Sequence, residues 1–331
     1  MEKIITALNE EYLIRPYTEK DEDKAASLWE LAFEKSFPEE VWRWKYHTGP
    51  FQNKILLCCD KNERIIVLYG GIPYRANCNG AGMEISHLMD IMSHPDFRKT
   101  GLFVHTVNSF IEMICGPEPD RSQLLYGFPG KYHFDIGNKY LEYRRIGDGV
   151  GFLSGKVSEI RRIRGAGKGI LRIADREQDF DSIWDRCASD YPFSVIRNTS
   201  FIRWRYFDHP AKEYEIYIFE RDSGRSPSGY AALSFENGTV SVIDMILPNT
   251  EADAASFFSE LSSISADRGF ETIRTWLPFR HFLTPRALES GFSLHPEPTG
   301  IIPTARSFDP SLSFDWVCDH IYYTMGDGDI A

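Results

Sequence analysis

The N-terminal half of the 331-residue chain alternates short apolar runs with amphipathic segments. Between residues 21 and 33, apolar side chains recur on one side of a 3.6-residue period, which predicts a helix with one buried face. Two apolar runs separated by a polar turn, at 55–60 and 65–75, indicate neighbouring strands. By the same criteria, further strands are expected at 12–16, 84–93, 123–128 and 143–146, and further helices at 102–114 and 132–141. The order predicts a mixed α/β (α+β) fold.

The second half repeats this order of elements. An aromatic and basic segment, Phe201–Tyr206, is followed by His-Pro, much as Val41–Tyr46 is followed by Gly-Pro. Strands are expected at 214–220, 230–235, 240–246 and 272–277, and helices at 251–268 and 282–290. A repeated order of this kind predicts a duplicated architecture. The tail from Trp316 to Asp329 is expected to hold a last strand and an acidic loop.

Composition places the chain among soluble globular proteins, with 42% hydrophobic and 26% charged residues. A net charge of −11 disfavours general binding to nucleic acid or to an anionic membrane. The N-terminus lacks the pattern of a signal peptide, and no apolar run approaches the roughly 18–20 residues of a membrane span. Six scattered cysteines without metal-site spacing predict reduced thiols, a cytoplasmic location and no metal site.

A basic turn between an apolar run and an amphipathic run is the strongest chemical signal. The apolar run 85–93 stops at His94-Pro95, and the amphipathic run begins at Leu102. Backbone N–H groups at a helix start point at one place, and the helix dipole there favours negative charge. Arg98 and Lys99 add positive charge, and Gly101 lacks the Cβ that would hold a ligand away. This order favours a diphosphate-binding turn.

The segment Arg98-Lys-Thr-Gly-Leu-Phe103 resembles the Arg/Gln-x-x-Gly-x-Gly/Ala signature of the GCN5-related N-acetyltransferases (GNAT). The resemblance implies that acetyl-coenzyme A (acetyl-CoA) is the co-substrate and that its pyrophosphate binds the backbone of this turn. It also implies that a backbone N–H of the preceding strand polarises the thioester carbonyl. The cofactor-binding residues expected on this basis are Ile91, Met92, Ser93, Arg98, Lys99, Thr100, Gly101, Leu102 and Phe103. Phe103 departs from the signature, which has a small residue there.

The resemblance further implies two GNAT-like domains, each with a mixed, mostly antiparallel central sheet flanked by helices. Residues 1–155 would form the domain with the acyl-CoA site, and 170–331 a degenerate copy. In that copy, the acidic segment Asn249–Asp253 follows the fourth strand in place of a basic turn, and acidic side chains would repel a diphosphate. Residues 156–169, which are basic and contain glycine, are expected to be a linker.

Acetyl transfer to an amine needs a base for the ammonium proton and an acid for the thiolate. Asp90 and Glu84 lie on the strand that leads into the basic turn, and Asp90 is the closer of the two to the donor. A carboxylate that caps a neighbouring loop is the alternative reading of Asp90. Many family members place an acidic Tyr five residues before the final aromatic of the following helix. Counting back from Tyr143 gives Asn138, so Tyr132 is the substitute expected as acid.

The predicted function is therefore N-acetyl transfer from acetyl-CoA to an amine of a small molecule, an amino sugar or a protein. The sequence is also compatible with a homodimer. Two alternatives stay open: an aminoacyltransferase of the FemABX type, and a non-catalytic GNAT-like module that binds CoA or a partner. The replacements at Phe103 and Asn138 support the second alternative.

Overall fold

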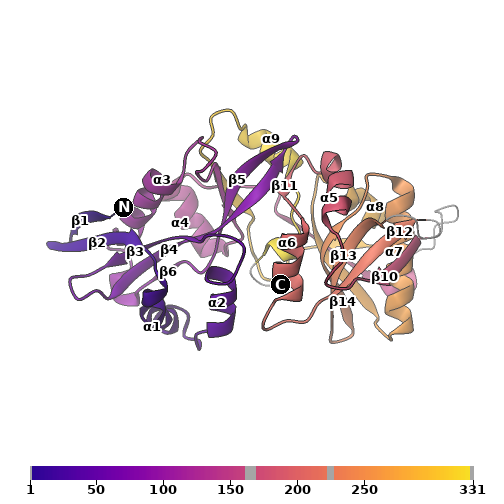
Figure 1. The fold of residues 1–331 in the computed structure, drawn as a ribbon, viewed down its shortest axis with the longest axis horizontal. Helices are drawn as coiled ribbons and strands as arrows, with labels where there is room; N and C mark the ends of the chain where they lie inside the picture. The colour runs from indigo at the N-terminus through magenta and orange to yellow at the C-terminus, as the bar shows by residue number, and fades with distance from the viewer. Residues whose placement is uncertain (1, 161–168, 222–226, 329–331) are drawn as a thin grey trace. The chain divides into compact units, whose positions relative to one another are not determined.

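The chain folds into two compact units in the computed structural model, which describes residues 2–160, 169–221 and 227–328 (Figure 1). Unit 1 comprises Met1–Arg75, Met83–Arg144 and Thr304–Ser313. Unit 2 comprises Ala76–Gly82, Arg145–Pro303 and Phe314–Ala331. Each unit is built on its own mostly antiparallel sheet flanked by helices, which confirms the expected α/β (α+β) class. No helix in the described parts of the chain is long and apolar enough to cross a membrane.

Unit 1 contains the elements expected for the first half of the sequence. Its strands are β1 (Lys3–Ala7), β2 (Glu10–Pro16), β3 (Lys54–Cys59), β4 (Ile65–Cys78), β5 (Ala81–Leu88), β6 (Met92–Ser93), β7 (Leu124–Gly127) and β17 (Thr304–Ser307), with β8 (Arg144–Arg145) at its boundary. The end of β4 and the start of β5, within residues 76–82, belong to unit 2. Its helices are α1 (Glu22–Phe33), α2 (Glu39–Tyr46), α3 (Leu102–Ile114) and α4 (Lys131–Leu141), with the short 3-10 turns η1 (Glu19–Asp21) and η2 (Pro95–Phe97).

The sheet of unit 1 has the order β1-β2-β3-β4-β5-β7-β17-β8, and β6 also pairs with β4. β5 and β7 are parallel, whereas the β1–β2, β2–β3, β3–β4 and β7–β17 pairs are antiparallel. Figure 1 shows α1 and α2 on one side of these strands and α3 and α4 on the other. The apolar face of α3, with Leu102, Val107 and Phe110, packs in a core with Leu56 and Tyr69. This packing fixes the start of α3 over the sheet.

Unit 2 contains a second sheet, ordered β10-β12-β13-β14-β15-β9-β16. Its strands are β9 (Val150–Lys156), β10 (Gly169–Ile173), β12 (Glu215–Arg221), β13 (Pro227–Glu236), β14 (Thr239–Ile246), β15 (Thr272–Pro278) and β16 (Ser293–His295); β11 (Phe193–Val195) pairs with residues 76–78 of the same unit. Its helices are α5 (Asp181–Cys187), α6 (Thr199–Ile202), the π-helix η5 (Arg203–Phe207), α7 (Glu251–Asp267), α8 (Leu283–Glu289) and α9 (Phe314–His320), with the 3-10 turns η3 (Val157–Glu159), η4 (Ala188–Asp190) and η6 (Met325–Asp327).

Three local features differ from the sequence expectations. The strand expected at 84–93 is broken, because Asp90 has a φ of 53° and only Met92–Ser93 resume pairing, as β6. The tail does not begin with a strand, because 314–320 form α9, in which Ile321 N donates to Val317 O. β9 pairs with β15 and β16, so residues 145–155 belong to unit 2 and not to the N-terminal domain expected at 1–155. Of the linker expected at 156–169, residues 161–168 lie outside the described residues.

Candidate functional site

The break in the strand that precedes the basic turn separates two neighbouring strands of unit 1. β5 and β7 pair in parallel from Ile85↔Leu124 to His87↔Tyr126. Beyond His87 the chain turns through Asp90 and continues as β6, which pairs with β4 on the other side. The backbone of 91–93 therefore has a partner strand on one side only in the described pairing. A strand with one unpaired side presents N–H groups that a ligand can use.

Ladder alternation identifies which amides face that unpaired side. The N–H of His94 donates to the carbonyl oxygen of Ile66 at 2.8 Å, toward β4. In an antiparallel ladder the hydrogen-bonding direction alternates from residue to residue, so Met92, opposite Leu68, also bonds toward β4. The amides of Ile91 and Ser93 then point away from β4. Alternation thus directs two of the three expected carbonyl-binding amides away from β4 and that of Met92 toward it.

The basic turn is exposed and shaped by its own backbone. The hydroxyl of Thr100 donates to Phe97 O at 2.6 Å, and Lys99 and Gly101 have positive φ values of 68° and 87°. A Cβ at Gly101 would meet only the ring of His105, at 3.9 Å, so the space in front of the turn is open. Glycine is required here by the backbone conformation, since positive φ disfavours residues with a Cβ.

The first turn of α3 supplies further amides. The first intrahelical hydrogen bond after the turn runs from His105 N to Gly101 O. The preceding N–H groups of a helix have no acceptor within it, which leaves those of Leu102, Phe103 and Val104 directed out of the helix start. The Arg98 side chain is exposed beside them and donates to Ala32 O at 3.3 Å. Amides and a guanidinium thus combine at one place, as an anion site needs.

Phe103 does not block this turn. Its side chain is partly buried and packs against the core, with its ring edge-on to Tyr69 at a centroid separation of 5.9 Å. The ring therefore replaces a small residue by filling core space. Asn138 also has a structural explanation: its amide donates to Tyr143 O at 2.8 Å and so satisfies a carbonyl just beyond the end of α4.

The positive charge of the basic turn affects a side chain at the start of α4. Burial, and after it the positive charge of Arg98, lowers the pKa of His133 below its usual value. Tyr132, the expected acid, precedes His133 and contacts its ring edge-on at 5.4 Å. The Tyr132 side chain is 63% exposed. Tyr132 is therefore exposed to solvent, and it lies next to a histidine whose pKa is lowered in part by the charge of Arg98.

Asp90 is held by two residues of α2. Its Oδ2 accepts hydrogen bonds from Lys45 Nζ at 3.0 Å and from Tyr46 Oη at 2.8 Å. All three side chains are largely buried. The sequence pattern had shown Lys45 and Tyr46 only as part of an aromatic cluster, because a contact across 44 or 45 residues has no local signal. The carboxylate thus joins α2 to the strand break.

Glu84 lies elsewhere in unit 1. Its carboxylate pairs with Lys54 and accepts from Ser122 Oγ at 3.3 Å. It lines a cavity of about 600 Å³, together with the aromatic side chains of Tyr17 and Tyr74. Glu84 lies within β5, which ends at Leu88, whereas Asp90 lies in the break beyond it, and the two carboxylates contact different side chains.

Part of unit 1 is similar to a known protein family. Residues 13–134 match the family model described as the acetyltransferase (GNAT) domain. No curated protein matches the chain.

Solved structures share the fold at low identity. A probable N-acyltransferase from Enterococcus faecalis V583 is 15% identical, with a TM-score of 0.66 over 90% of this chain and 73% of that one. A GCN5-related N-acetyltransferase from Anabaena variabilis is 11% identical, with a TM-score of 0.68 and the same coverage. N-myristoyltransferase of Saccharomyces cerevisiae, solved with myristoyl-CoA, is 9% identical, with a TM-score of 0.56 over 92% of this chain and 80% of that one.

Proposed function

We propose that the chain is an acyl-CoA-dependent N-acyltransferase whose donor site lies in unit 1, where residues 13–134 match the GNAT domain. One observation carries the proposal. The backbone break at Asp90 directs the amides of Ile91 and Ser93 to an unpaired side of the strand, a few residues before an open basic turn. This spacing suits a donor with a thioester at one end and a diphosphate at the other.

The diphosphate would bind the amides at the start of α3, with Arg98 and Lys99 beside it. Oriented amides and the helix dipole stabilise a bound anion without reorganising, because the fold already fixes them. Thr100 and Gly101 set the turn that aims these amides, and Phe103 anchors the helix start to the core. The roles expected for the segment 98–103 are thus proposed for its backbone and for two basic side chains.

The transfer step would use the amides of the strand break. The acceptor nitrogen attacks the thioester carbon, its bond to that carbon forms, and the carbon–sulfur bond breaks. An N–H at Ile91 or Ser93 would stabilise the negative charge that develops on the carbonyl oxygen. The ammonium proton must leave before attack, and the thiolate takes up a proton afterwards. We assign the second proton to Tyr132, which is exposed at the start of α4.

Asp90 remains the proposed base candidate nearest the donor, with one requirement set by the structure. Lys45 and Tyr46 both contact Oδ2 of this carboxylate. A proton from the acceptor would therefore have to reach a carboxylate that already bonds to a lysine and a tyrosine. Glu84 lies earlier in the chain, within β5, and pairs with Lys54, so we propose no role for it in proton transfer at Ile91 and Ser93.

Acetyl-CoA is the proposed donor and an amine the proposed acceptor. One structural neighbour was solved with myristoyl-CoA and another is described as a glucosamine N-acetyltransferase region, so acyl length and an amino-sugar acceptor both belong in the assay. A cytoplasmic location is supported by six cysteines that are all free thiols. A homodimer is proposed only because the sequence is compatible with one.

The test combines binding and turnover. We expect acetyl-CoA to bind wild-type protein in calorimetry and Arg98→Glu to weaken that binding at least tenfold, because the change reverses one full charge beside the diphosphate. Arg121→Glu, which changes a guanidinium beyond the end of α3, is the matched control and should leave affinity unchanged. A thiol-release assay over a panel of amines and acyl-CoA chain lengths then identifies the acceptor. Unchanged affinity in Arg98→Glu would contradict the site.

A further inference from the structure

Units 1 and 2 contain the same clamp between a helix and a bent strand. In unit 1 the hydroxyl of Tyr46 donates to Asp90 Oδ2 at 2.8 Å. In unit 2 the hydroxyl of Tyr206 donates to Asp244 Oδ2, also at 2.8 Å. Each tyrosine ends a Trp-basic-Tyr segment of a helix, which is Trp44–Tyr46 in one unit and Trp204–Tyr206 in the other. The clamp therefore gives a residue-by-residue correspondence of the two units around Asp90 and Asp244.

In both units the parallel strand pairing stops two or three residues before the carboxylate. β14 pairs in parallel with β15 from Thr239↔Thr272 to Val242↔Thr275, and the pairing stops just before Asp244. β13 shows a register shift opposite the same point, between Ala232 and Leu233. With Asp244 matched to Asp90, the backbones of Met245 and Leu247 correspond to those of Ile91 and Ser93. These are the positions proposed to bind the thioester in unit 1.

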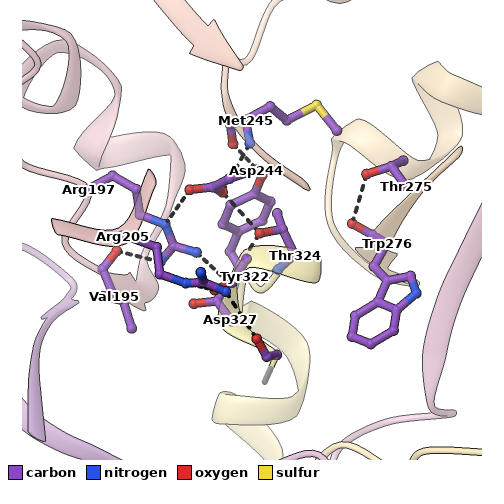
Figure 2. A network of polar contacts seen from close by, with 12 residues as sticks. Val195, Arg197, Arg205, Asp244, Met245, Thr275, Trp276, Tyr322, Thr324 and Asp327 are labelled. Atoms are coloured by element: carbon purple, nitrogen blue, oxygen red, sulfur yellow. Dashed lines mark hydrogen bonds and ion pairs between the residues drawn. The ribbon is translucent and has the colours of Figure 1, made fainter. Parts of the chain in front are cut away.

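In unit 2 the backbone N–H and C=O groups at Met245 and Leu247 form hydrogen bonds with other groups of the protein. Leu247 N donates to the Tyr191 hydroxyl at 2.8 Å, and that hydroxyl donates to Leu247 O at 2.8 Å. The N–H of Met245 donates to Asp244 Oδ1 at 3.0 Å, and the carbonyl of Met245 accepts from the Tyr322 hydroxyl (Figure 2). No N–H or C=O of these two positions is left for a ligand on this side.

A buried ion cluster fixes the tail segment that contributes Tyr322. Thr324 donates to Asp244 Oδ1 at 3.0 Å, and the guanidinium of Arg197 lies between Asp244 and Asp327 (Figure 2). Arg197 and Asp244 have no exposed side-chain surface, and Asp327 has 3%. Removing this segment would take Asp327 away from the buried guanidinium of Arg197, and breaking a buried ion pair by removing one partner is strongly unfavourable. The tail is therefore a permanent part of the unit.

The segment after β14 also disfavours a diphosphate. Thr250 caps α7 by accepting from Asp253 N at 3.1 Å, so the helix start already has its own acceptor. Glu251 and Asp253 place negative charge in the first turn, where unit 1 has Arg98 and Lys99 before its helix. Like charges raise the free energy of a bound diphosphate.

We propose that, in unit 2, Tyr191 and the tail segment Ile321–Gly328 fill the place that the acyl donor takes in unit 1. The chain then holds one acyl-CoA, and unit 2 is a structural copy completed by the chain's own C-terminal segment. The comparison of donor positions rests on the proposed function. The closure of Met245 and Leu247 by tyrosine hydroxyls does not, and it can be tested separately.

The first experiment measures amide hydrogen exchange on the full chain. Tyr191→Phe removes the hydroxyl that bonds both N–H and C=O of Leu247 while keeping the ring, so we expect about tenfold faster exchange at Leu247. Tyr322→Phe should act in the same way on peptides around Met245. Tyr140→Phe, at an exposed position of α4, is the matched control without effect. Unchanged exchange in both Tyr191→Phe and Tyr322→Phe would overturn the closure.

The second experiment counts acetyl-CoA by calorimetry. We expect one molecule per wild-type chain, bound at least tenfold more weakly in Arg98→Glu. Two molecules per chain, residual tight binding in Arg98→Glu, or protection of the Met245–Leu247 peptide by acetyl-CoA would overturn the inference. No binding to wild type would refute the proposed function and with it the matching of donor positions. The exchange experiment would then still decide whether the tail closes unit 2.

Discussion

The buried ion cluster of unit 2 gives the sharpest quantitative prediction. Asp244→Ala removes a carboxylate that accepts from Tyr206 at 2.8 Å, Tyr230 at 2.7 Å, Thr324 at 3.0 Å and Arg197 at 3.4 Å. It leaves Arg197 fully buried with Asp327 as its one remaining carboxylate among the described residues. Breaking a buried ion pair by removing one partner costs about 3–5 kcal/mol.

That cost converts into a large change in melting temperature. For a unit of roughly 150–250 residues, 1 kcal/mol shifts the melting temperature by about 2–4 °C, so Asp244→Ala should lower it by about 6–20 °C. The assay is thermal unfolding followed by circular dichroism and calorimetry, with the transition of unit 2 assigned by hydrogen exchange. Asp208→Ala removes the carboxylate of an exposed ion pair with Arg176 and is the control, expected to change the melting temperature little. A fall of less than 3 °C in Asp244→Ala would refute the reasoning that the cluster holds unit 2 together.

Two further predictions concern the donor turn and a buried histidine. Gly101→Ala places a Cβ at a φ of 87°, which costs about 1–2 kcal/mol, so calorimetry should show acetyl-CoA binding weakened about five- to thirtyfold. The control Gly130→Ala, at a negative φ, should change binding little. Equal effects of the two substitutions would contradict the role of the turn. Burial, and after it the charge of Arg286, lowers the pKa of His281 to about 3. The imidazole takes up this proton near pH 6.5 in the unfolded chain, so His281 makes the free energy of unfolding fall as pH drops from about 6.5 to 3. His281→Phe should therefore reduce the dependence of the urea-denaturation midpoint on pH over that range. An unchanged pH dependence would exclude this source of acid sensitivity.

Much of the fold could be predicted from local pattern because period and turn chemistry are local properties. The helix at 22–33 and the strands at 54–59 and 65–78 lie within a few residues of the expected ranges. The basic turn followed by a helix at Leu102 was predicted by residue types alone, since glycine and basic side chains at a helix start have a direct physical meaning. The match of residues 13–134 to the GNAT domain agrees with the resemblance seen in that turn.

The remainder depends on contacts between distant residues. Nothing near Asp90 in the sequence reveals that Lys45 and Tyr46 hold it, or that the strand breaks there. The Trp-Val-Cys run in the tail favoured a strand, but 314–320 form a helix, and the segment after it packs around Arg197. The catalytic roles of Asp90, Glu84 and Tyr132 stay predictions, and the duplication stays a proposal supported by the repeated clamp.

A crystal structure of the acetyl-CoA complex tests the central claim most directly. The account predicts diphosphate oxygens within hydrogen-bonding distance, about 2.7–3.2 Å, of the amides at Leu102–Val104, and the thioester oxygen at the N–H of Ile91 or Ser93. Unit 2 would hold no acetyl-CoA. Electron density for the cofactor at any other place, with the turn at Gly101 empty, would contradict the account.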